Sequence, residues 1–313
     1  MPTSRARRWL AVLPLVAAAL TMSLAADRQV VRTGDPAARG YTAADFPRVQ
    51  KLAAGVYTYE QLRSAGAETF TTVSLFVVTP EGVLVADGQG SVAETRRLVE
   101  EIGRITPTPV THVVIGSDHG DHTAGNAAFA AGVAYYAHPT SKAVMESSRT
   151  PLPATTTLVS GKEVIRLGGV EVQVLFLGRA HSGGDLSVYL PKDKILFMSE
   201  AYLNRIFPAM RSAFPSEWVA TIEKAQQMAV DTYVPGHGFV ESPAILKEEL
   251  ETYRKALTQV IAEGKRLHTA GVPVDEAVKT AAFGDLERWT IRASQGPIAI
   301  RRVYLELDGK LPR

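Results

Sequence analysis

Short apolar runs separated by turn residues recur along the chain, and they alternate with segments of helical spacing. Residues 72–79, 110–116 and 170–177 are apolar runs of strand length, so the pattern predicts strands there. Residues 91–94 (Ser-Val-Ala-Glu) form a capping box, and the apolar spacing after them predicts a helix. Strands and helices mix throughout, which predicts an α/β (α+β) layered fold with much hairpin pairing. Further strands are expected at 82–87, 133–137, 185–190, 195–199 and 231–235, and further helices at 123–131 and 215–229.

The character of the chain changes after residue 240. Ser242 and Pro243 predict the start of a helix, because serine caps a helix N-terminus and proline suits the first turn. Apolar residues then recur at helical spacing up to Gly271. Two shorter helices are expected at 275–282 and 298–307. We therefore predict a core with an N-terminal lead-in at 27–240 and a helical extension at 241–313.

The first residues have the pattern of an export signal. Arginines within 5–8 precede an apolar run at 9–25, which is 17 residues long. A membrane-spanning helix needs about 20 apolar residues, and small residues at 23–26 offer a cleavage site. We predict a signal peptide at 1–26 and a periplasmic or secreted protein with no stable membrane insertion after cleavage. An uncleaved anchor helix is the alternative, and the choice between general secretory and twin-arginine export stays open.

Composition excludes several classes of function. The 313 residues carry a formal net charge of +2, and three positive charges lie in the predicted signal peptide, so the rest of the chain carries +2 minus 3, or −1. A near-neutral chain gives no support for a nucleic-acid partner. The chain has no cysteine, which removes disulfides, thiolate metal ligands and a cysteine nucleophile. We expect a small-molecule substrate as the partner, and the oligomeric state stays open.

Four of the seven histidines fall in loops directly after predicted strands. The first group follows the strand at 110–116 and contains His119, Asp121 and His122. A tight loop there turns all three side chains into one cavity, and imidazole and carboxylate together suit a divalent metal such as zinc. The alternative makes Asp121 a helix N-cap and leaves both histidines on the surface.

Each of three later elements is weak evidence for a metal site when it is taken alone. His181 lies in a glycine-rich loop between two predicted strands, Glu200 stands at the end of a strand, and His237 is flanked by glycines after the last strand. Their occurrence together, in this order after the first group, is the specific signal.

These residues resemble the pattern of the metallo-β-lactamase-fold hydrolase superfamily. Its members carry His-x-His-x-Asp-His, then a lone His, an Asp and a final His, on loops at one edge of a two-sheet sandwich. The resemblance spans about 56–240 and implies a four-layer αββα sandwich, here with a C-terminal helical extension. Asp87, at the end of an early strand, would then support the metal site by holding its ligands in place, without binding the metal itself. The alternative is that Asp87 is an ordinary carboxylate in a turn.

The resemblance also implies two metal sites that share a bridging carboxylate. His119 and His181 would belong to one site, and Asp121, His122 and His237 would belong to the other.

The sequence departs from the family pattern at two positions. Ser117 stands where the first histidine belongs, and Glu200 stands where the bridging aspartate belongs. A serine hydroxyl is a far poorer ligand than imidazole. The longer glutamate side chain bridges the two metals, binds one of them or swings out. We expect one or two Zn²⁺ per chain, one of them bound tightly, although iron and manganese also accept such ligands.

The resemblance implies an exported hydrolase that uses metal-activated water on an ester, lactone, thioester or amide bond. Asp121 would bind metal and orient the water or return a proton to the leaving group. Two alternatives stay open. One is a β-lactamase proper, because export places the enzyme where such drugs act. The other is a degenerate, non-catalytic member that binds a metal or ligand, which Ser117 favours.

We expect Tyr202, Asn204, Arg205 and the hairpin at 68–72 to line the mouth of the pocket. An arginine there would meet a substrate carboxylate, or it would make a surface ion pair instead.

Overall fold

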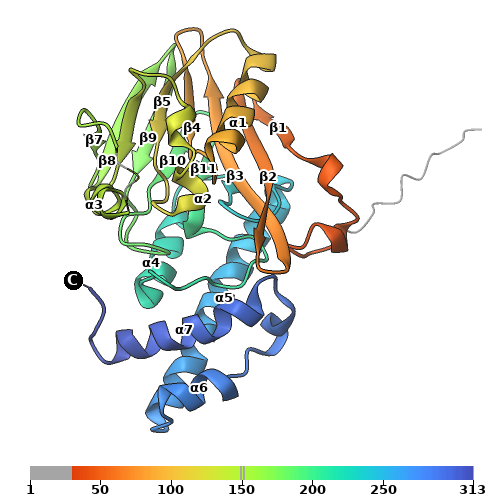
Figure 1. Cartoon of the computed structure of the whole chain (residues 1–313), viewed down its shortest axis with the longest axis vertical. Coiled ribbons are helices and arrows are strands. Elements are labelled where there is room, and N and C mark those ends of the chain that lie inside the picture. The colour runs from red at the N-terminus through yellow and green to blue at the C-terminus, as the bar shows by residue number, and fades with distance from the viewer. Residues whose placement is uncertain (1–29, 149, 151, 313) are drawn as a thin grey trace, which may run out of the picture. The chain divides into compact units, whose positions relative to one another are not determined.

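Two β-sheets packed face to face form the upper part of the structure in Figure 1, with helices α4 to α7 (residues 215–307) below them. A computed structural model describes residues 30–148, 150 and 152–312, and the predicted signal peptide lies outside them. The first sheet has seven strands in the order β1-β2-β3-β4-β5-β6-β7, and the second has five in the order β12-β11-β10-β9-β8. The strands are β1 (Arg48–Ala53), β2 (Val56–Ala65), β3 (Glu68–Val78), β4 (Val83–Ala86), β5 (Val110–Val114), β6 (Ala134–Ala137), β7 (Thr157–Leu158), β8 (Lys162–Leu167), β9 (Val170–Leu175), β10 (Ser187–Leu190), β11 (Ile195–Phe197) and β12 (Thr232–Val234).

Side chains of the central strand β4 serve two different cores, because successive residues of a strand point to opposite faces. Leu84 and Ala86 belong to the core between the sheets, together with residues of the second sheet such as Val188. Val83 and Val85 belong to a separate core on the outer face of the first sheet. Because both faces of β4 are buried, its sequence is a continuous run of apolar residues.

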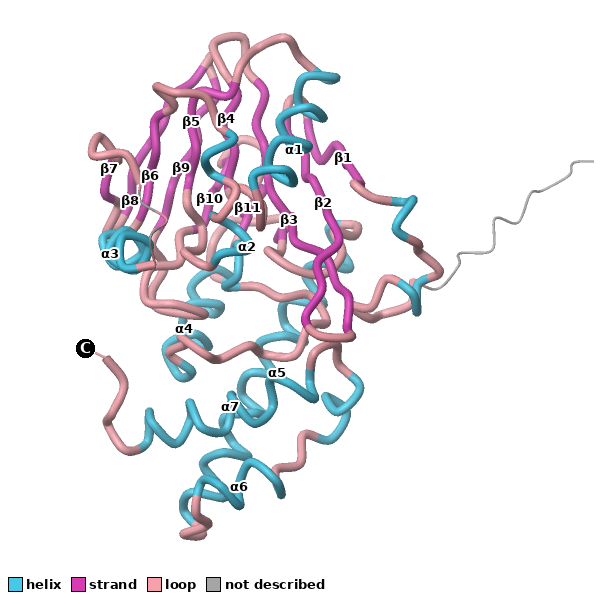
Figure 2. The backbone as a smooth tube through the Cα atoms, in the orientation of Figure 1, coloured by secondary structure: helices cyan, strands magenta, loops and turns pink. Residues whose placement is uncertain are grey.

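Helices cover the outer faces of both sheets, which confirms the predicted αββα layers (Figure 2). Leu98 and Ile102 of the first helix pack into the outer core of the first sheet. Half of the predicted capping box is present: the Ser91 hydroxyl accepts a hydrogen bond from the backbone N–H of Glu94 (3.2 Å), while the Glu94 carboxylate accepts one from that hydroxyl (2.9 Å). The helices are α1 (Val92–Ile105), α2 (Gly120–Thr123), α3 (Pro139–Ser147), α4 (Pro215–Gln226), α5 (Pro243–Thr269), α6 (Val274–Thr280) and α7 (Arg292–Leu307). Among the described residues, none of the helices combines the length and apolar character needed to cross a bilayer.

Two predictions of local structure are wrong. The first strand expected from the sequence begins at residue 72, yet Arg48–Ala53 and Val56–Ala65 are already paired strands. The predicted helix at 123–131 is only the short α2 and a 3-10 turn at Asn126–Ala128. A run of small residues has helical propensity, but Gly125 packs against the start of α1: its N–H donates to the carbonyl of Gln89 (2.9 Å), and a Cβ there would lie 2.2 Å from the carbonyl oxygen of Ser91.

The C-terminal extension packs against the loops that end the second sheet. The indole of Trp218 on α4 donates to the carbonyl of Ala201 (2.8 Å), and its ring lies edge-on to Tyr253 of α5. The backbone of Phe207 donates to the carbonyl of Thr290 just before α7 (3.0 Å). The extension therefore borders the region where the candidate site residues lie. The predicted limits of the three chain segments stay predictions.

Glu60 on β2 is a fully buried carboxyl in the hairpin formed by β1 and β2. Arg48 lies 3.3 Å away, and the side-chain amide of Gln50 donates to the carboxyl at 2.6 Å. Burial raises the pKa of Glu60 from 4.5 to about 7, against the opposing charge of Arg48. The folded protein therefore favours the protonated form of this side chain.

We expect Glu60 to make the protein less stable as the pH rises from about 4.5 to about 7. In this window the folded state holds a proton that the unfolded chain releases, so stability is lost at up to about 1.4 kcal/mol per pH unit. Glu60→Gln should flatten the dependence and raise the free energy of unfolding at pH 8 by about 1–3 kcal/mol. Urea unfolding at pH 5 and pH 8 measures both effects. Glu248→Gln, at a side chain that is 70% exposed, is the matched control, and an equal effect in the control would contradict the explanation.

Candidate metal centre

All six predicted ligand residues lie where strands of the two sheets end. The loop after β5 leads into the short helix α2, whose first turn carries Asp121 and His122 directly after His119. His181 lies in the loop between β9 and β10, Glu200 lies just after β11, and His237 lies after β12. These strand ends share one edge of the sandwich, so residues far apart in the sequence meet there.

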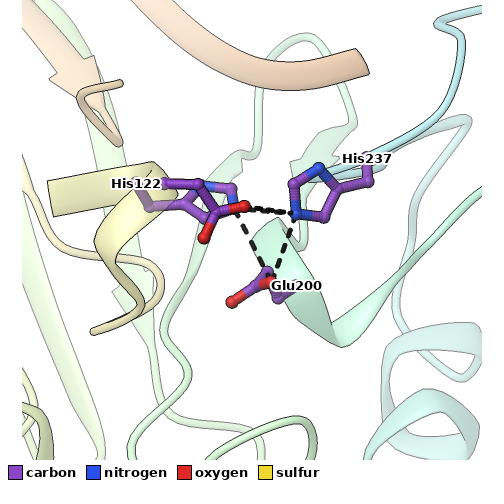
Figure 3. A group of neighbouring side chains, drawn as sticks. His122, Glu200 and His237 are labelled. Atoms are coloured by element: carbon purple, nitrogen blue, oxygen red, sulfur yellow. Dashed lines mark hydrogen bonds and ion pairs between the residues drawn. The ribbon is translucent and has the colours of Figure 1, made fainter. Parts of the chain in front are cut away.

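Four of these residues converge in one group. Ligand atoms of Asp121, His122, Glu200 and His237 all lie within 4.8 Å of one another. Nε2 of His237 lies 3.2 Å from a carboxylate oxygen of Asp121 and 3.2 Å from Oε1 of Glu200. Figure 3 shows His122 and His237 facing each other, with the Glu200 carboxylate beside them.

A second group consists of His119, His181 and again Glu200. Nδ1 of His119 lies 3.0 Å from Oε2 of Glu200, and Nδ1 of His181 lies 3.1 Å from the same oxygen. The two imidazole rings meet edge to face, with centroids 4.6 Å apart. Glu200 therefore presents Oε1 to the first group and Oε2 to the second.

Ser117 does not leave a gap where the family pattern has a histidine. Its hydroxyl donates a hydrogen bond to Oε2 of Glu200 and accepts one from the backbone N–H of His119 (3.2 Å). The serine is fully buried. Its hydroxyl thus orients the longer glutamate side chain between the two groups.

Two surrounding contacts set the orientation of the inner histidines. Nδ1 of His237 donates to the backbone carbonyl of Thr71 (2.9 Å), which directs Nε2 into the site. Nδ1 of His122 lies 3.1 Å from a carboxylate oxygen of Asp87, and both side chains are fully buried. The other oxygen of Asp87 accepts the backbone N–H of Gly116 (2.6 Å). Such contacts fix which ring nitrogen faces a metal and raise its basicity.

Close backbone packing positions Glu200. Ser199, the residue before it, has φ 47°, and its carbonyl accepts the N–H of Gly236 (2.8 Å). A Cβ at Gly236 would lie 2.4 Å from the carbonyl carbon of Ser199, so only glycine fits. The glycine before His237 therefore brings the β11 and β12 loops into direct backbone contact.

Neighbouring charges shift the pKa values of several side chains in the site. Burial alone would lower the pKa of His119, but the Glu200 carboxylate outweighs burial and raises that pKa to about 10. Burial likewise opposes protonation of His237, while hydrogen bonds to Asp121 and Glu200 raise its pKa to about 10. Burial favours neutral Glu200, yet the charge of His181 and the neighbouring imidazoles holds the pKa of Glu200 well below 4.5. Protons thus compete with a metal for these nitrogens, which makes metal affinity pH-dependent.

The arrangement fits a divalent metal. Nε2 of His122 and Nε2 of His237 lie 3.2 Å apart and point into the same space. Nδ1 of His181 is buried and lies 3.1 Å from Oε2 of Glu200, but the two atoms are not aligned for a hydrogen bond. Four imidazoles and two carboxylates with inward nitrogens and oxygens are the donor set that zinc and similar ions accept.

The sequence matches the model of the Metallo-beta-lactamase superfamily over residues 68–237. The chain belongs to the metallo-beta-lactamase superfamily. Solved structures of this superfamily show the same fold: a metallo-beta-lactamase from Pontibacter korlensis superposes with a TM-score of 0.61 at 22% identity, covering 67% of this chain and 98% of that chain. The superfamily typically binds metal ions, and the two residue groups are its candidates here.

Curated proteins that the chain matches are distant from it in sequence. The 2,4-dinitroanisole O-demethylase subunit alpha of Nocardioides sp. (strain JS1661) is 25% identical over 227 residues, which is 70% of this chain and 66% of that protein. The metallo-beta-lactamase IND-1 of Chryseobacterium indologenes is 22% identical over 216 residues, which is 67% of this chain and 90% of that protein.

A cavity of about 420 Å³ opens onto the candidate metal centre. His119, Asp121, His181, Glu200 and His237 line it, while His122 lies beneath them, fully buried. The remaining lining comes from β2, β3, the segment after Glu200 and the start of α7.

The predicted pocket mouth is wrong for the residues that follow Glu200. Tyr202 and Asn204 are buried and hydrogen-bond to backbone carbonyls of the core. Arg205 makes two hydrogen bonds to Glu249 of α5 (2.5 and 2.9 Å), which matches the ion-pair alternative instead of the substrate clamp. The hairpin does reach the cavity, through Phe70.

Sequence reasoning missed two arginines of the cavity wall. Arg63 on β2 and Arg211 in the segment before α4 both line the cavity. For Arg63 the alternation of side chains along β2 was a usable signal. In the hairpin Arg63 lies directly opposite Phe70. Nothing in the local sequence distinguishes Arg211 from a solvent-exposed loop residue.

Proposed function

We propose that this protein is a metal-dependent hydrolase that acts on an ester, lactone, thioester or amide bond of a small molecule. The position of Glu200 carries the proposal. Its two carboxylate oxygens face two separate histidine groups at the floor of one cavity. A carboxylate placed between two ligand sets can bridge two divalent ions, and paired ions of this kind act together in hydrolysis.

We propose zinc as the metal, with one or two ions per chain. Asp121, His122 and His237 would hold the first ion, His119 and His181 would contribute to the second, and Glu200 would contact both. Divalent ions in such sites lower the pKa of water to about 7 and polarise the oxygen of the bond that is attacked.

The side chains of this protein supply the remaining functions. The carboxylate of Asp121 faces the cavity, where it can orient the attacking water and pass a proton to the leaving group. Asp87 and Thr71 hold the rings of His122 and His237 in place. The hydroxyl of Ser117 holds Glu200.

The names of the relatives guide the choice of substrates to test. One relative is named an O-demethylase and another a β-lactamase, so an aryl methyl ether and a β-lactam belong beside ester, lactone and thioester probes. We keep the β-lactamase and the non-catalytic binding protein as the competing functions.

We also propose that the protein is exported after cleavage near residue 26, on the basis of its basic and apolar N-terminal pattern. N-terminal sequencing of the protein from the periplasmic fraction should give a start near Asp27. A start at Met1 in the membrane fraction would support the anchor alternative instead.

The test of the function compares metal content and hydrolysis in protein that begins at Asp27. We expect the wild type to keep one zinc per chain after dialysis and to take up a second at higher zinc concentration. Ser117→His should retain two, because it adds an imidazole to His119 and His181. Ser117→Ala, which removes the hydroxyl without adding a ligand, is the matched control and should weaken binding of the second ion.

The outcomes separate the competing functions. Metal-dependent turnover of one of the probes, abolished by a chelator and restored by zinc, supports the hydrolase. Bound zinc without turnover of any probe would favour the non-catalytic binding protein. Absence of bound zinc in both the wild type and Ser117→His would contradict the metal centre itself.

A further inference from the structure

We propose that the mouth of the metal cavity binds an oxyanion of the substrate, a carboxylate or phosphate group, through Arg63 and Arg211. The inference rests on the proposed function, because it names the substrate class of the same site. The substrate would carry its negative charge on a part of the molecule away from the bond that is cleaved.

Arg63 is directed toward the metal centre by the β2–β3 hairpin. It pairs in register with Phe70, so both side chains lie on the same face of the sheet. The Phe70 ring lies edge-on to His237, with centroids 5.1 Å apart, and Nε of Arg63 lies 3.5 Å from a carboxylate oxygen of Asp121. A Cβ at Gly90 would lie 2.7 Å from Nη1 of Arg63, so this glycine makes room for the guanidinium.

Arg211 approaches the cavity from the segment between Glu200 and α4. Its side chain is exposed, and within the described part of the chain it makes no ion pair. Arg302 of α7 holds the adjacent backbone by donating hydrogen bonds to the carbonyls of Ser212 (3.0 Å) and Ala213. The backbone next to Arg211 is therefore held in place, and the guanidinium of Arg211 is available to bind a ligand.

The charges of the lining favour an anion. Asp121 and Glu200 are the acidic residues that line the cavity, and both belong to the candidate metal groups. When metal binds the carboxylates of Asp121 and Glu200, Arg63 is left without another ion-pair partner among the described residues. Two cationic guanidinium groups beside a metal centre then form a field that attracts a negative group. The planar guanidinium fork also matches the oxygens of a carboxylate or phosphate.

Much of the remaining wall is apolar, although Ser64, Ser212 and Gln295 also line it. Phe70, Leu203, Ile206 and Ile291 line the same cavity as the two arginines and the candidate metal ligands. A ligand that fits would therefore carry an apolar part as well as its anionic group.

The C-terminal extension holds the subsite in a fixed shape. The carboxylate of Glu68, at the hairpin end near Arg63, accepts the backbone N–H of Ile291 (2.7 Å). Ile291 has φ 61°, a left-handed conformation that is rare for a β-branched residue. Its side chain is nonetheless buried against the cavity. The hairpin is thus tied to the start of α7, and Arg63 does not depend on a mobile loop for its position.

The kinetic test uses two esters that differ only in a terminal carboxylate: mono-4-nitrophenyl adipate and 4-nitrophenyl hexanoate. Arg63→Ala and Arg211→Ala should each lower kcat/KM for the adipate ester about tenfold, and the double variant about a hundredfold. The hexanoate ester should change less than about threefold. Arg166→Ala, at an exposed arginine of β8, is the matched control. Equal losses on both esters, or no loss on the adipate ester, would overturn the proposal.

A binding measurement keeps the test independent of turnover. Calorimetric titration of zinc-loaded protein with adipate should give a Kd that rises about tenfold in each arginine variant and is unchanged in Arg166→Ala. Zinc content measured in parallel excludes an effect of Arg63 through Asp121, and Arg63→Lys should recover part of the affinity. n-Hexyl phosphate in the same titration shows which oxyanion is preferred.

The two proposals fail in different ways. An adipate Kd that is identical in all variants would mean that the carboxylate binds only at the metal centre, and the subsite would be wrong even if esters are hydrolysed. Arginine-dependent adipate binding without hydrolysis of any probe would support the subsite and contradict the hydrolase.

Discussion

Glu200→Gln is expected to lower metal-dependent hydrolysis by more than about 100-fold and to leave fewer than one zinc per chain after dialysis. Loss of a residue that merely contacts a metal ligand typically costs 10- to 100-fold in affinity or activity, and Glu200 is placed to contact both ions. The amide of glutamine cannot serve both groups, because its NH₂ would face either His237 or the pair of His119 and His181. Metal analysis of dialysed protein and initial rates on the best probe measure the two effects.

The control for this substitution is Glu171→Gln, which removes a carboxylate from an exposed ion pair with Arg166. It should leave metal content and rates unchanged. If Glu200→Gln binds as much zinc as the wild type and turns over the probe at a similar rate, the carboxylate does not bridge and the mechanism proposed here is wrong.

Gly236→Ala is expected to destabilise the protein by about 3 kcal/mol or more and to reduce zinc binding at the same time. Its Cβ would lie 2.4 Å from the carbonyl carbon and 2.6 Å from the carbonyl oxygen of Ser199. Backbone atoms cannot rotate away as a flexible side chain does, so the β11 and β12 loops must separate, and overpacking of this kind costs about 1–3 kcal/mol or more. Separation of the loops would move Glu200 away from His237.

The matched control is Gly103→Ala on α1, where an added Cβ has no atom within 4 Å. Alanine in a helix is favoured over glycine by about 1 kcal/mol, so this variant should be neutral or slightly more stable. Thermal unfolding of both variants, with and without zinc, gives the comparison. A Gly236→Ala protein with wild-type stability and zinc content would show that the contact between the two loops relaxes at little cost.

The sequence alone was sufficient for the family, the layered fold and the order of the candidate ligands. Each strand that carries a ligand is a short apolar run ended by a turn residue, and that local pattern predicts a polar side chain at the sheet edge. The helix beginning at Pro243 could also be predicted, because its first-turn proline and its apolar spacing are local features, although Ser242 makes no capping hydrogen bond with its side chain. The predicted helix at 123–131 failed since propensity was the only signal there and the tertiary packing overrode it.

Only the tertiary structure decided how the unusual residues work together. Ser117 and Glu200 are 83 residues apart, and their hydrogen bond exists because strands of different sheets end at the same edge. For the same reason the sequence placed Arg205 at the pocket, whereas Glu249 of α5 pairs with it and Arg63 occupies the cavity wall instead. Local sequence patterns determine which residues stand at the ends of elements. Contacts between distant segments determine which side chains face each other, and those depend on how the sheets and the C-terminal helices pack.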